Sequence, residues 1–444
     1  EISSGYSYYL NGKTMAAVGL HLWFLWLRLF CKNQENPSVS FGCTSLQSSI
    51  FSTKGQRSMT PSSAFKIKTL AVSAALACAG LVGTAQAETT VRLGFAAPLT
   101  GPQAHYGEDM RNGLTLALEE ANAKGIKLDG DTAKFVLVSK DDQADPRTAV
   151  QVAQQIADAK VNGMLGHFNS GTTIPASRVY NDAGIPQIAM ATSPEYTLQG
   201  YDTTFRMMTS DTQQGAAVGV FIVKDLKAKK VAVIDDRTAY GQGLTDQVIA
   251  AVKRAGGEIV AREYTTDKAT DFTAILTSIK AKGAEAIFFG GLDAQSGPMR
   301  RQMQTLGITQ PLVSGEMTRS DTFLKLAGEA ANGTYASLAG VPLKTMAQGE
   351  QFAAAYKARF KVDPGVYAPY AYDGAWNMIA AMEQAGSAKA DKYLPKLANL
   401  KRSGATSAHI AYDKNGDLNE VAVTIYTVKG GKWEEVKTIV DSAK

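Results

Sequence analysis

Cysteine is scarce in this 444-residue chain and is missing from most of it. The three cysteines, Cys31, Cys43 and Cys78, all lie within residues 1–87. The rest of the chain therefore cannot form a disulfide, a cysteine-ligated zinc site or an iron–sulfur cluster. A cysteine nucleophile is excluded there for the same reason.

A charge excess of one sign is also missing after residue 87. The full sequence has a formal net charge of +5, which alone would suggest an acidic partner. Residues 1–87 supply the whole excess, with seven basic and two acidic side chains, whereas the later residues hold 39 of each sign. Because nucleic-acid binding depends on neutralising phosphates with basic side chains, we expect no nucleic-acid partner.

Motifs of catalysis and metal binding are absent as well. The sequence has no GxxxxGK[ST] loop, no GxSxG, no HExxH and no GxGxxG that opens a helix after a strand. After residue 87 the histidines are His105, His167 and His409, which are far apart and lack metal-ligand spacing. The neighbours Asp141 and Asp142 could bind a metal or act as acid and base, but a capping pair at a strand end explains them more simply. We therefore expect neither an enzyme nor a cofactor or metal.

The segment 59–87 has the parts of a secretory signal peptide in their usual order. Lys66 and Lys68 form a positive region behind Met59, an apolar run covers 69–82, and Ala85-Gln86-Ala87 is a small-x-small cleavage site. We expect export and cleavage after Ala87.

The remaining N-terminal residues, 1–58, are then upstream sequence that is not translated, or are disordered. A membrane anchor around 16–30 is the competing interpretation, although this apolar run is short and interrupted. Lipidation at Cys78 is a second alternative, weakened because Ala75 stands where a lipoprotein signal usually has leucine.

After residue 87, short apolar runs alternate with longer amphipathic ones. The run at 91–97 has the length of a buried strand, and apolar positions over 107–124 recur at helical spacing. This alternation predicts α/β architecture with parallel sheets and helices on both faces. The strands are too many for one compact sheet, so we expect two similar Rossmann-like lobes with a first crossing near 209–211. In the tail, 406–412 and 421–428 are predicted strands.

Six segments that each follow a predicted strand carry a family resemblance. They are PLTGPQAHYG at 98–107, GHFNSGTT at 166–173, ATSPE at 191–195, AYGQG at 239–243, FGG at 289–291 and SGE at 314–316. In this order and spacing they resemble the periplasmic leucine/isoleucine/valine-binding proteins of ABC transporters, along essentially all of 88–444. Each motif alone is weak, whereas six in collinear order are specific.

The resemblance implies a type I periplasmic binding protein fold. Two lobes would be joined by three crossovers, with the ligand in the cleft between them. We place lobe 1 at 88–209 plus 340–423, and lobe 2 at 210–339 plus 424–444.

Roles for the ligand's head group are also implied by the resemblance. Ser170 and Thr192 match residues that bind an amino acid's α-carboxylate, and the start of the following helix suits an anion. Glu316 matches the acidic residue that pairs with the ligand's ammonium, helped by the carbonyl of Met190 and the hydroxyl of Thr192. A carboxylate is needed there because a desolvated ammonium left unpaired costs several kcal/mol.

Further positions match the walls of the family's cleft. Phe168 replaces a smaller aliphatic residue and Tyr367 fills another wall position, so both should narrow the pocket. Leu292 stands where an aromatic residue is common, which widens it, and Asn169 adds a polar group. The complete set of wall positions is Tyr106, Tyr240, Phe168, Asn169, Leu292 and Tyr367.

A disulfide common in the family is absent from this chain. It joins the loop after the second strand to the serine-bearing loop, where this sequence has Ala144 and Asn169. Because both positions lack cysteine, the whole disulfide is missing and no single cysteine is left unpaired there.

The expected function is that of an exported, non-enzymatic binding protein for an aliphatic, branched-chain amino acid. It would act as a monomer, close by hinge motion and deliver the ligand to the membrane permease of an ABC importer. One methylene in such a pocket changes binding by only about 1–3 kcal/mol, so exclusive recognition of one aliphatic amino acid is not expected. The alternatives are a binder of a smaller or ω-amino acid, an amide or urea, a ligand-sensing module for a separate signalling partner, and an enzyme using Asp141 and Asp142.

Overall fold

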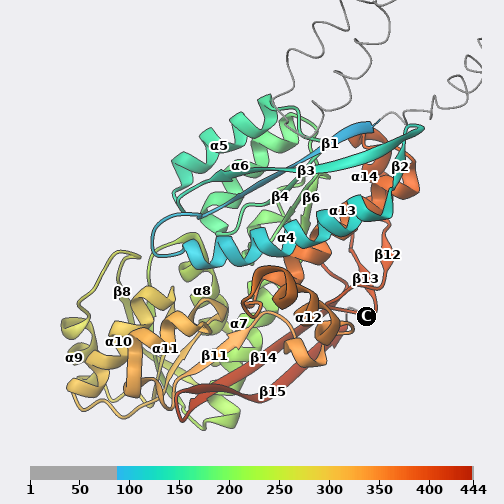
Figure 1. Cartoon of the computed structure of the whole chain (residues 1–444). Coiled ribbons are helices and arrows are strands. Elements are labelled where there is room, and N and C mark those ends of the chain that lie inside the picture. Colours follow the sequence, from blue (N-terminus) through green and yellow to red (C-terminus); the bar gives the residue numbers. More distant parts are fainter. Residues whose placement is uncertain (1–87, 443–444) are drawn as a thin grey trace, which may run out of the picture. The chain divides into compact units, whose positions relative to one another are not determined.

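The computed structural model of the chain describes residues 88–442 (Figure 1). The predicted signal peptide, its cleavage site and the possible lipidation at Cys78 lie outside these residues. Within 88–442, no helix is both long and apolar enough to cross a membrane.

A first sheet has six strands in the order β2-β3-β1-β4-β5-β6. All neighbouring strands are parallel except β2 and β3, which are antiparallel. The C-terminal ends of the parallel strands therefore meet at one edge of the sheet. The strands are β1 (Glu88–Ala97), β2 (Lys127–Leu128), β3 (Asp131–Asp141), β4 (Gly163–Gly166), β5 (Gln187–Ala189) and β6 (Thr204–Arg206).

Helices cover both faces of the first sheet because β1 is apolar on both sides. Leu93 and Phe95 pack in one hydrophobic cluster with α4, whereas Ala96 packs in another with α5 and α6. Alternate residues of a strand point to opposite faces, so the two clusters lie on opposite sides of the sheet. The helices are α4 (Ala104–Lys124) with α13 (Ala368–Ala385) on one side, and α5 (Pro146–Asp158) with α6 (Ser170–Asp182) on the other (Figure 1).

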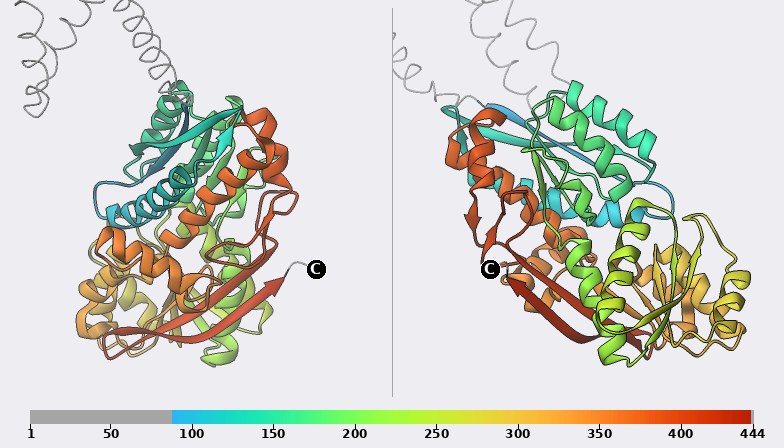
Figure 2. Two further views of the ribbon diagram at one scale, coloured as in Figure 1. Left: turned by 45° about the vertical axis from the view of Figure 1, so that its right-hand side comes forward. Right: turned by 180° about the vertical axis from the view of Figure 1, so that it is seen from behind.

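The second sheet has seven strands in the order β15-β14-β11-β10-β9-β7-β8. Its last two strands in sequence, β14 and β15, are antiparallel and run along one border of the sheet (Figure 2). The other neighbours are parallel. The strands are β7 (Lys230–Asp235), β8 (Glu258–Tyr264), β9 (Ala286–Gly290), β10 (Leu312–Ser314), β11 (Tyr335–Leu338), β14 (Glu420–Lys429) and β15 (Lys432–Ser442).

This sheet is also covered on both faces. Val231 and Val233 of β7 pack in the same cluster as α7 and α8, and Ala232 and Ile234 pack with α9 and α10. The helices around this sheet are α7 (Asp211–Val220), continued by a π-helical turn at Phe221–Asp225, and α8 (Ala239–Arg254), α9 (Thr273–Ala281), α10 (Asp293–Thr305) and α11 (Asp321–Ala327). The remaining elements are α12 (Gly349–Phe360), α14 (Ala390–Ala398), the short pair β12 (Lys401–Arg402) and β13 (Ile410–Ala411), and 3₁₀ turns at Pro194–Tyr196, Glu316–Thr318, Gly328–Ala331 and Leu343–Thr345.

The chain passes between the two sheets three times, and Thr209 contacts all three passages. Thr209 follows β6, its amide donates to the carbonyl of Ala339 at 3.5 Å, and its hydroxyl donates to the carbonyl of Ala422 at 2.7 Å. A third hydrogen bond joins the second and third passages directly, from the Thr424 hydroxyl to the Gly340 carbonyl at 2.8 Å. We propose that these three crossovers are the hinge between lobe 1 (88–209 plus 340–423) and lobe 2 (210–339 plus 424–444).

The predicted fold class is confirmed, with corrections in the tail. The strand predicted at 421–428 is β14. The strand predicted at 406–412 is wrong except for Ile410–Ala411, because the Asp373 carboxylate accepts the backbone amides of Ala405 and Thr406 in place of a neighbouring strand. The sequence analysis also missed β15, whose side chains are mostly exposed or half-buried and lack a buried apolar pattern.

Candidate functional site

The predicted binding residues gather where the C-terminal ends of strands from both sheets face each other. They follow β1, β4 and β5 of the first sheet and β7, β9 and β10 of the second, and Tyr367 precedes α13. Asn169 is half-buried and the others are buried, each at most 4% exposed: Tyr106, Phe168, Ser170, Met190, Thr192, Tyr240, Leu292, Glu316 and Tyr367.

The two faces of this cleft touch each other. The Tyr106 hydroxyl donates to the carbonyl of Met317 at 2.5 Å. Beside it, Nε2 of His105 lies 3.0 Å from a carboxylate oxygen of Asp293. These contacts join residues following β1 to residues following β9 and β10, so the cleft is closed in this structure.

Three aromatic rings pack against one another at the side of the cleft. The centroid of Phe168 lies 4.7 Å from that of Tyr367 and 5.3 Å from that of Tyr106, and the two tyrosine rings are 5.6 Å apart. The structure thus brings together an aromatic trio, Tyr106, Phe168 and Tyr367, which the sequence analysis named as wall positions of the cleft. Their role as ligand walls remains a prediction.

Ser170 lies at the first position of α6, and Asn169 precedes it as the N-cap residue. The amides of a helix's first turn have no acceptor within the helix, and the helix dipole is positive at this end. The Ser170 hydroxyl accepts a hydrogen bond from the Ser193 amide at 3.2 Å, which joins the loops after β4 and β5. This side of the cleft therefore offers hydroxyls and a helix start to an anion.

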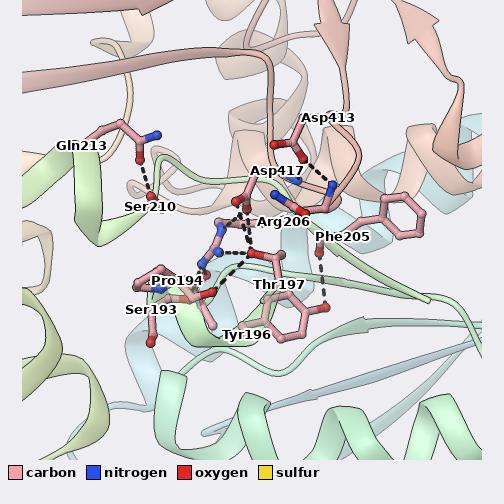
Figure 3. Close-up of polar contacts among 12 residues, drawn as sticks. Ser193, Pro194, Tyr196, Thr197, Phe205, Arg206, Ser210, Gln213, Asp413 and Asp417 are labelled. Carbon is pink, nitrogen blue, oxygen red and sulfur yellow. Dashed lines mark hydrogen bonds and ion pairs between the residues drawn. The ribbon is translucent and has the colours of Figure 1, made fainter. Parts of the chain in front are cut away.

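Arg206 holds the loop that carries Thr192, and the sequence analysis missed it. Its side chain is fully buried, and its Nη1 donates to the carbonyls of Ala191 and Ser193, both at 2.7 Å (Figure 3). Its Nε donates to the Asp417 carboxylate at 2.7 Å, and its Nη2 to the Thr197 hydroxyl at the same distance. Only the structure reveals this role, because Arg206 and Asp417 are far apart in the sequence.

The other face of the cleft carries two buried carboxylates. Glu316 is 2% exposed and accepts a hydrogen bond from the Tyr240 hydroxyl at 3.0 Å. Asp211, at the start of α7, is fully buried, and its Oδ2 has no hydrogen-bond partner among the described residues. The sequence analysis missed Asp211 because an aspartate at a helix start is usually a capping residue.

Burial perturbs the acidity of both groups. Desolvation raises the pKa of Glu316 above its usual range. Desolvation and then the nearby Glu316 carboxylate raise the pKa of Asp211 to about 8. No basic side chain of the described residues forms an ion pair with either group within 4.0 Å. This pair therefore offers a strong binding place for a cation that arrives with a ligand.

The Gln214 side-chain amide bridges Asp211 and Ser337 of β11. The Gln214 Nε2 donates to Oδ1 of Asp211 at 3.3 Å, and Oε1 of Gln214 accepts from the Ser337 hydroxyl at 2.8 Å. The Ser337 bond orients the amide so that its donor side faces Asp211.

Other predicted residues have more limited roles in the structure. The Asn169 amide donates to Oε1 of Gln103 at 2.7 Å, while its own Oδ1 is buried and has no hydrogen-bond partner within residues 88–442. Met190 and Leu292 belong to the hydrophobic cluster that also contains the aromatic trio. Tyr240 is more than a wall residue, because its hydroxyl bonds Glu316 directly.

Asp141 and Asp142 do not form an acid–base pair. Asp141 accepts the amides of Leu99 and Gln143 at 2.9 and 2.8 Å, as expected for a capping residue. Asp142 is fully buried and bonds His167. Residues 88–442 contain no group of three or more His, Cys, Asp or Glu side chains able to hold a metal ion.

A cavity of about 740 Å³ opens beside the aromatic trio. Tyr106 and Tyr367 line it, together with His105 from one face of the cleft and Arg319 from the other. Ser170, Thr192 and Glu316 are not among its lining residues, so this cavity is distinct from the predicted head-group site.

Comparisons with known proteins agree with this geometry. A family model described as a periplasmic binding protein matches residues 90–432. An amino acid binding protein from Pseudomonas aeruginosa is 36% identical over 369 residues, covering 81% of this chain and 95% of that relative. A Leu/Ile/Val-binding protein homolog from Brucella abortus is 32% identical over 354 residues, covering 80% of this chain and 92% of that relative. The structure of a branched-chain amino acid transporter substrate-binding protein from Streptococcus pneumoniae, in complex with isoleucine, matches with a TM-score of 0.70 and 26% identity, covering 80% of this chain and 100% of that one.

Proposed function

The chain belongs to the periplasmic binding protein family, and from that premise we propose that it binds an aliphatic, branched-chain amino acid for an ABC importer. It is a transport-type binding protein and not an enzyme. The ligand would lie in the cleft between the two sheets, and hinge closure would present the closed shape to a membrane permease.

The opposite chemistry of the two cleft faces carries this proposal. One face offers the Ser170 and Thr192 hydroxyls and the start of α6, which suit a carboxylate. The other face offers the buried carboxylates of Glu316 and Asp211, which suit an ammonium. A free α-amino acid carries both groups on one carbon and therefore matches both faces at once.

An aliphatic side chain is supported by the surroundings of the head-group site. Phe168, Tyr106 and Tyr367 supply apolar rings, and Met190 and Leu292 belong to the same hydrophobic cluster. One relative is described as a Leu/Ile/Val-binding protein homolog, and the Streptococcus pneumoniae protein was crystallised in complex with isoleucine. The narrow spacing of the aromatic trio supports a smaller or ω-amino acid as the second candidate ligand.

The cellular setting is part of the proposal. The signal peptide predicted over 59–87 would export the protein to the periplasm with cleavage after Ala87. The permease would be its partner there, and we expect the protein to act as a monomer.

A thermal-shift screen of residues 88–444, unfolded and refolded to remove any bound ligand, tests the function. The panel contains leucine, isoleucine, valine, short ω-amino acids, short amides and urea, and isovalerate, which is valine without its ammonium group. A ligand of the native state raises the melting temperature once its concentration exceeds its Kd. We expect shifts with the branched-chain amino acids and none with isovalerate. Shifts only with ω-amino acids would change the ligand class, and a shift with isovalerate would contradict the ammonium site.

A further inference from the structure

Three buried side chains form a continuous hydrogen-bonded chain beneath the binding groups of lobe 1. Oδ2 of Asp142 lies 2.6 Å from Nδ1 of His167, and Nε2 of His167 lies 3.1 Å from the Tyr180 hydroxyl. All three residues are fully buried. Because an ionised carboxylate only accepts hydrogen bonds, Nδ1 of His167 carries a proton and donates to Asp142.

This series of hydrogen bonds connects the ends of three strands of the first sheet, β1, β3 and β4. Asp142 follows β3, its amide donates to the carbonyl of Ala97 at the end of β1 at 3.2 Å, and its Oδ1 accepts the Ala144 amide at 3.0 Å. His167 follows β4, and Tyr180 lies on α6. One imidazole thus ties the β3 loop to the β4 loop and to the helix that begins at the binding site.

His167 directly precedes the predicted binding residues Phe168, Asn169 and Ser170. Its carbonyl also accepts the Met190 amide at 3.5 Å, which extends the connection to the loop that carries Thr192. A displacement of His167 would therefore move the Ser170 hydroxyl and the start of α6.

We propose that His167 is a positioning residue for ligand binding, and that its bond to Asp142 is a noncovalent clasp between the β3 and β4 loops. The clasp lies two residues from Ala144 and two from Asn169, where the family resemblance implies a disulfide that this chain lacks. A buried bond between a carboxylate and an imidazole is stronger than a neutral one and leaves neither group unpaired. Its effect on binding rests on the proposed amino-acid function, whereas its effect on loop order does not.

Two substitutions of His167 separate the two bonds. In His167→Asn the side-chain amide reproduces the Nδ1 donor, so the bond to Asp142 is kept and the bond to Tyr180 is lost. In His167→Gln the amide reproduces the Nε2 position, so the clasp is lost. Tyr393→Phe is the control, because Tyr393 is fully buried in the same lobe and its hydroxyl bonds the Asn162 carbonyl at 2.7 Å, outside the predicted binding residues.

The first measurement is leucine affinity by calorimetry on protein freed of ligand. We expect His167→Gln to weaken binding about 10- to 100-fold, because a buried carboxylate loses its donor and the loop shifts. His167→Asn, Tyr180→Phe and Tyr393→Phe should stay within about threefold of wild type. Wild-type affinity in His167→Gln, or an equal loss in Tyr393→Phe, would overturn the positioning role.

The second measurement is amide hydrogen exchange without ligand, which remains informative if wild-type protein does not bind leucine. Faster exchange in His167→Gln should be confined to residues 140–145 and 166–172, and it should be absent from His167→Asn. Faster exchange throughout the first sheet, or in neither loop, would contradict the clasp. Should His167→Gln fail to fold, Asp142→Asn is the milder variant, because its single acceptor oxygen can serve only one of the two donors, His167 and the Ala144 amide, that the carboxylate serves. The same local pattern is expected there, and an unchanged exchange profile would contradict the clasp.

Discussion

The two faces of the cleft differ in how their buried charges are compensated. On the lobe 1 face, Arg206 pairs with Asp417, and Asp142 with His167. On the lobe 2 face, Asp211 and Glu316 are buried near each other, and neither has an ion-pair partner among residues 88–442. The Asp417 and Asp142 carboxylates of lobe 1 therefore have partners without a ligand, whereas the two lobe 2 carboxylates have no cation beside them in this part of the chain.

In the proposed mechanism, this difference would give closure of the cleft a physical cause. A ligand can shift a conformational equilibrium only by binding one state better than the other. An ammonium held by lobe 1 would gain its carboxylate partners only when lobe 2 closes over it. Changes to lobe 2 carboxylates should therefore affect affinity, and changes to the lobe 1 network should affect stability as well.

Glu316→Gln should have the largest effect on affinity. It preserves shape but removes the charge that faces the ammonium, so leucine binding should weaken about 100-fold or more. The stability of the free protein should stay equal or rise, because a desolvated carboxylate is removed. Calorimetry and thermal unfolding measure both, with the exposed Glu350→Gln as control. Wild-type affinity in Glu316→Gln would remove this residue from the site.

Arg206→Lys tests the lobe 1 face, and it should lower stability as well as affinity. Lysine keeps the charge but cannot reproduce the planar fork that bonds two carbonyls, a hydroxyl and a carboxylate. We expect a loss of about 2–4 kcal/mol in the free energy of unfolding, together with weaker binding. Denaturant titration without ligand measures the first, and an unchanged midpoint would show that the loop does not depend on this network.

The next largest effect should be a pH dependence of stability and of leucine affinity that comes from the lobe 2 face and not from the lobe 1 face. Asp211 has a folded pKa of about 8, above its ordinary value of 3.8, and the pKa of Glu316 is also raised. The folded state thus binds more protons than the unfolded state between these values, so the free protein should lose stability as pH rises from about 4 to about 8. Leucine affinity should rise over the upper part of that window, because the ionised carboxylates attract the ammonium.

Thermal unfolding and calorimetry from pH 5 to pH 8.5 follow both trends. Asp211→Asn is the matched control and should flatten each of them, while the lobe 1 variant Arg206→Lys should not. If Asp211→Asn retained the full pH dependence, the titrating groups would have to lie elsewhere.

Phe168→Leu, on the lobe 1 face, should produce the smallest effect, a change in which amino acid the protein binds best. A shorter side chain opens space beside the ligand, and binding of larger amino acids should improve relative to valine by about 1–3 kcal/mol. Phe352→Leu is the control, since Phe352 is also 4% exposed but belongs to a different hydrophobic cluster. Equal ligand preferences in the two variants would show that Phe168 does not shape the pocket.

The sequence predicted the strands and helices more completely than it predicted the buried polar side chains around the cleft. Strands such as β1 and helices such as α4 are visible because the spacing of apolar residues reports burial directly. Tyr106, Phe168 and Tyr367 were named as cleft-wall positions from the family resemblance, whereas their packing against one another became visible only in the structure.

Arg206 and Asp211 were not foreseen, for a different reason. An arginine or aspartate in a sequence is normally exposed, and its burial depends on partners that only the fold supplies. Asp417 lies 211 residues after Arg206, so no local pattern connects them. Exposed strands such as β15 were missed because they carry little apolar periodicity.

The interleaved path of the chain has a consequence for its synthesis. The Thr427 hydroxyl bonds the carbonyl of Thr334, 93 residues earlier, and Asn112 bonds the Tyr356 hydroxyl across 244 residues. Each of these contacts therefore waits for a residue that is synthesised long after its partner. Contacts of such long separation form slowly, so the earlier elements cannot complete their native packing until the later ones have been made. In the proposed export, a secretion channel that accepts only unfolded polypeptide would meet the chain before this packing is complete.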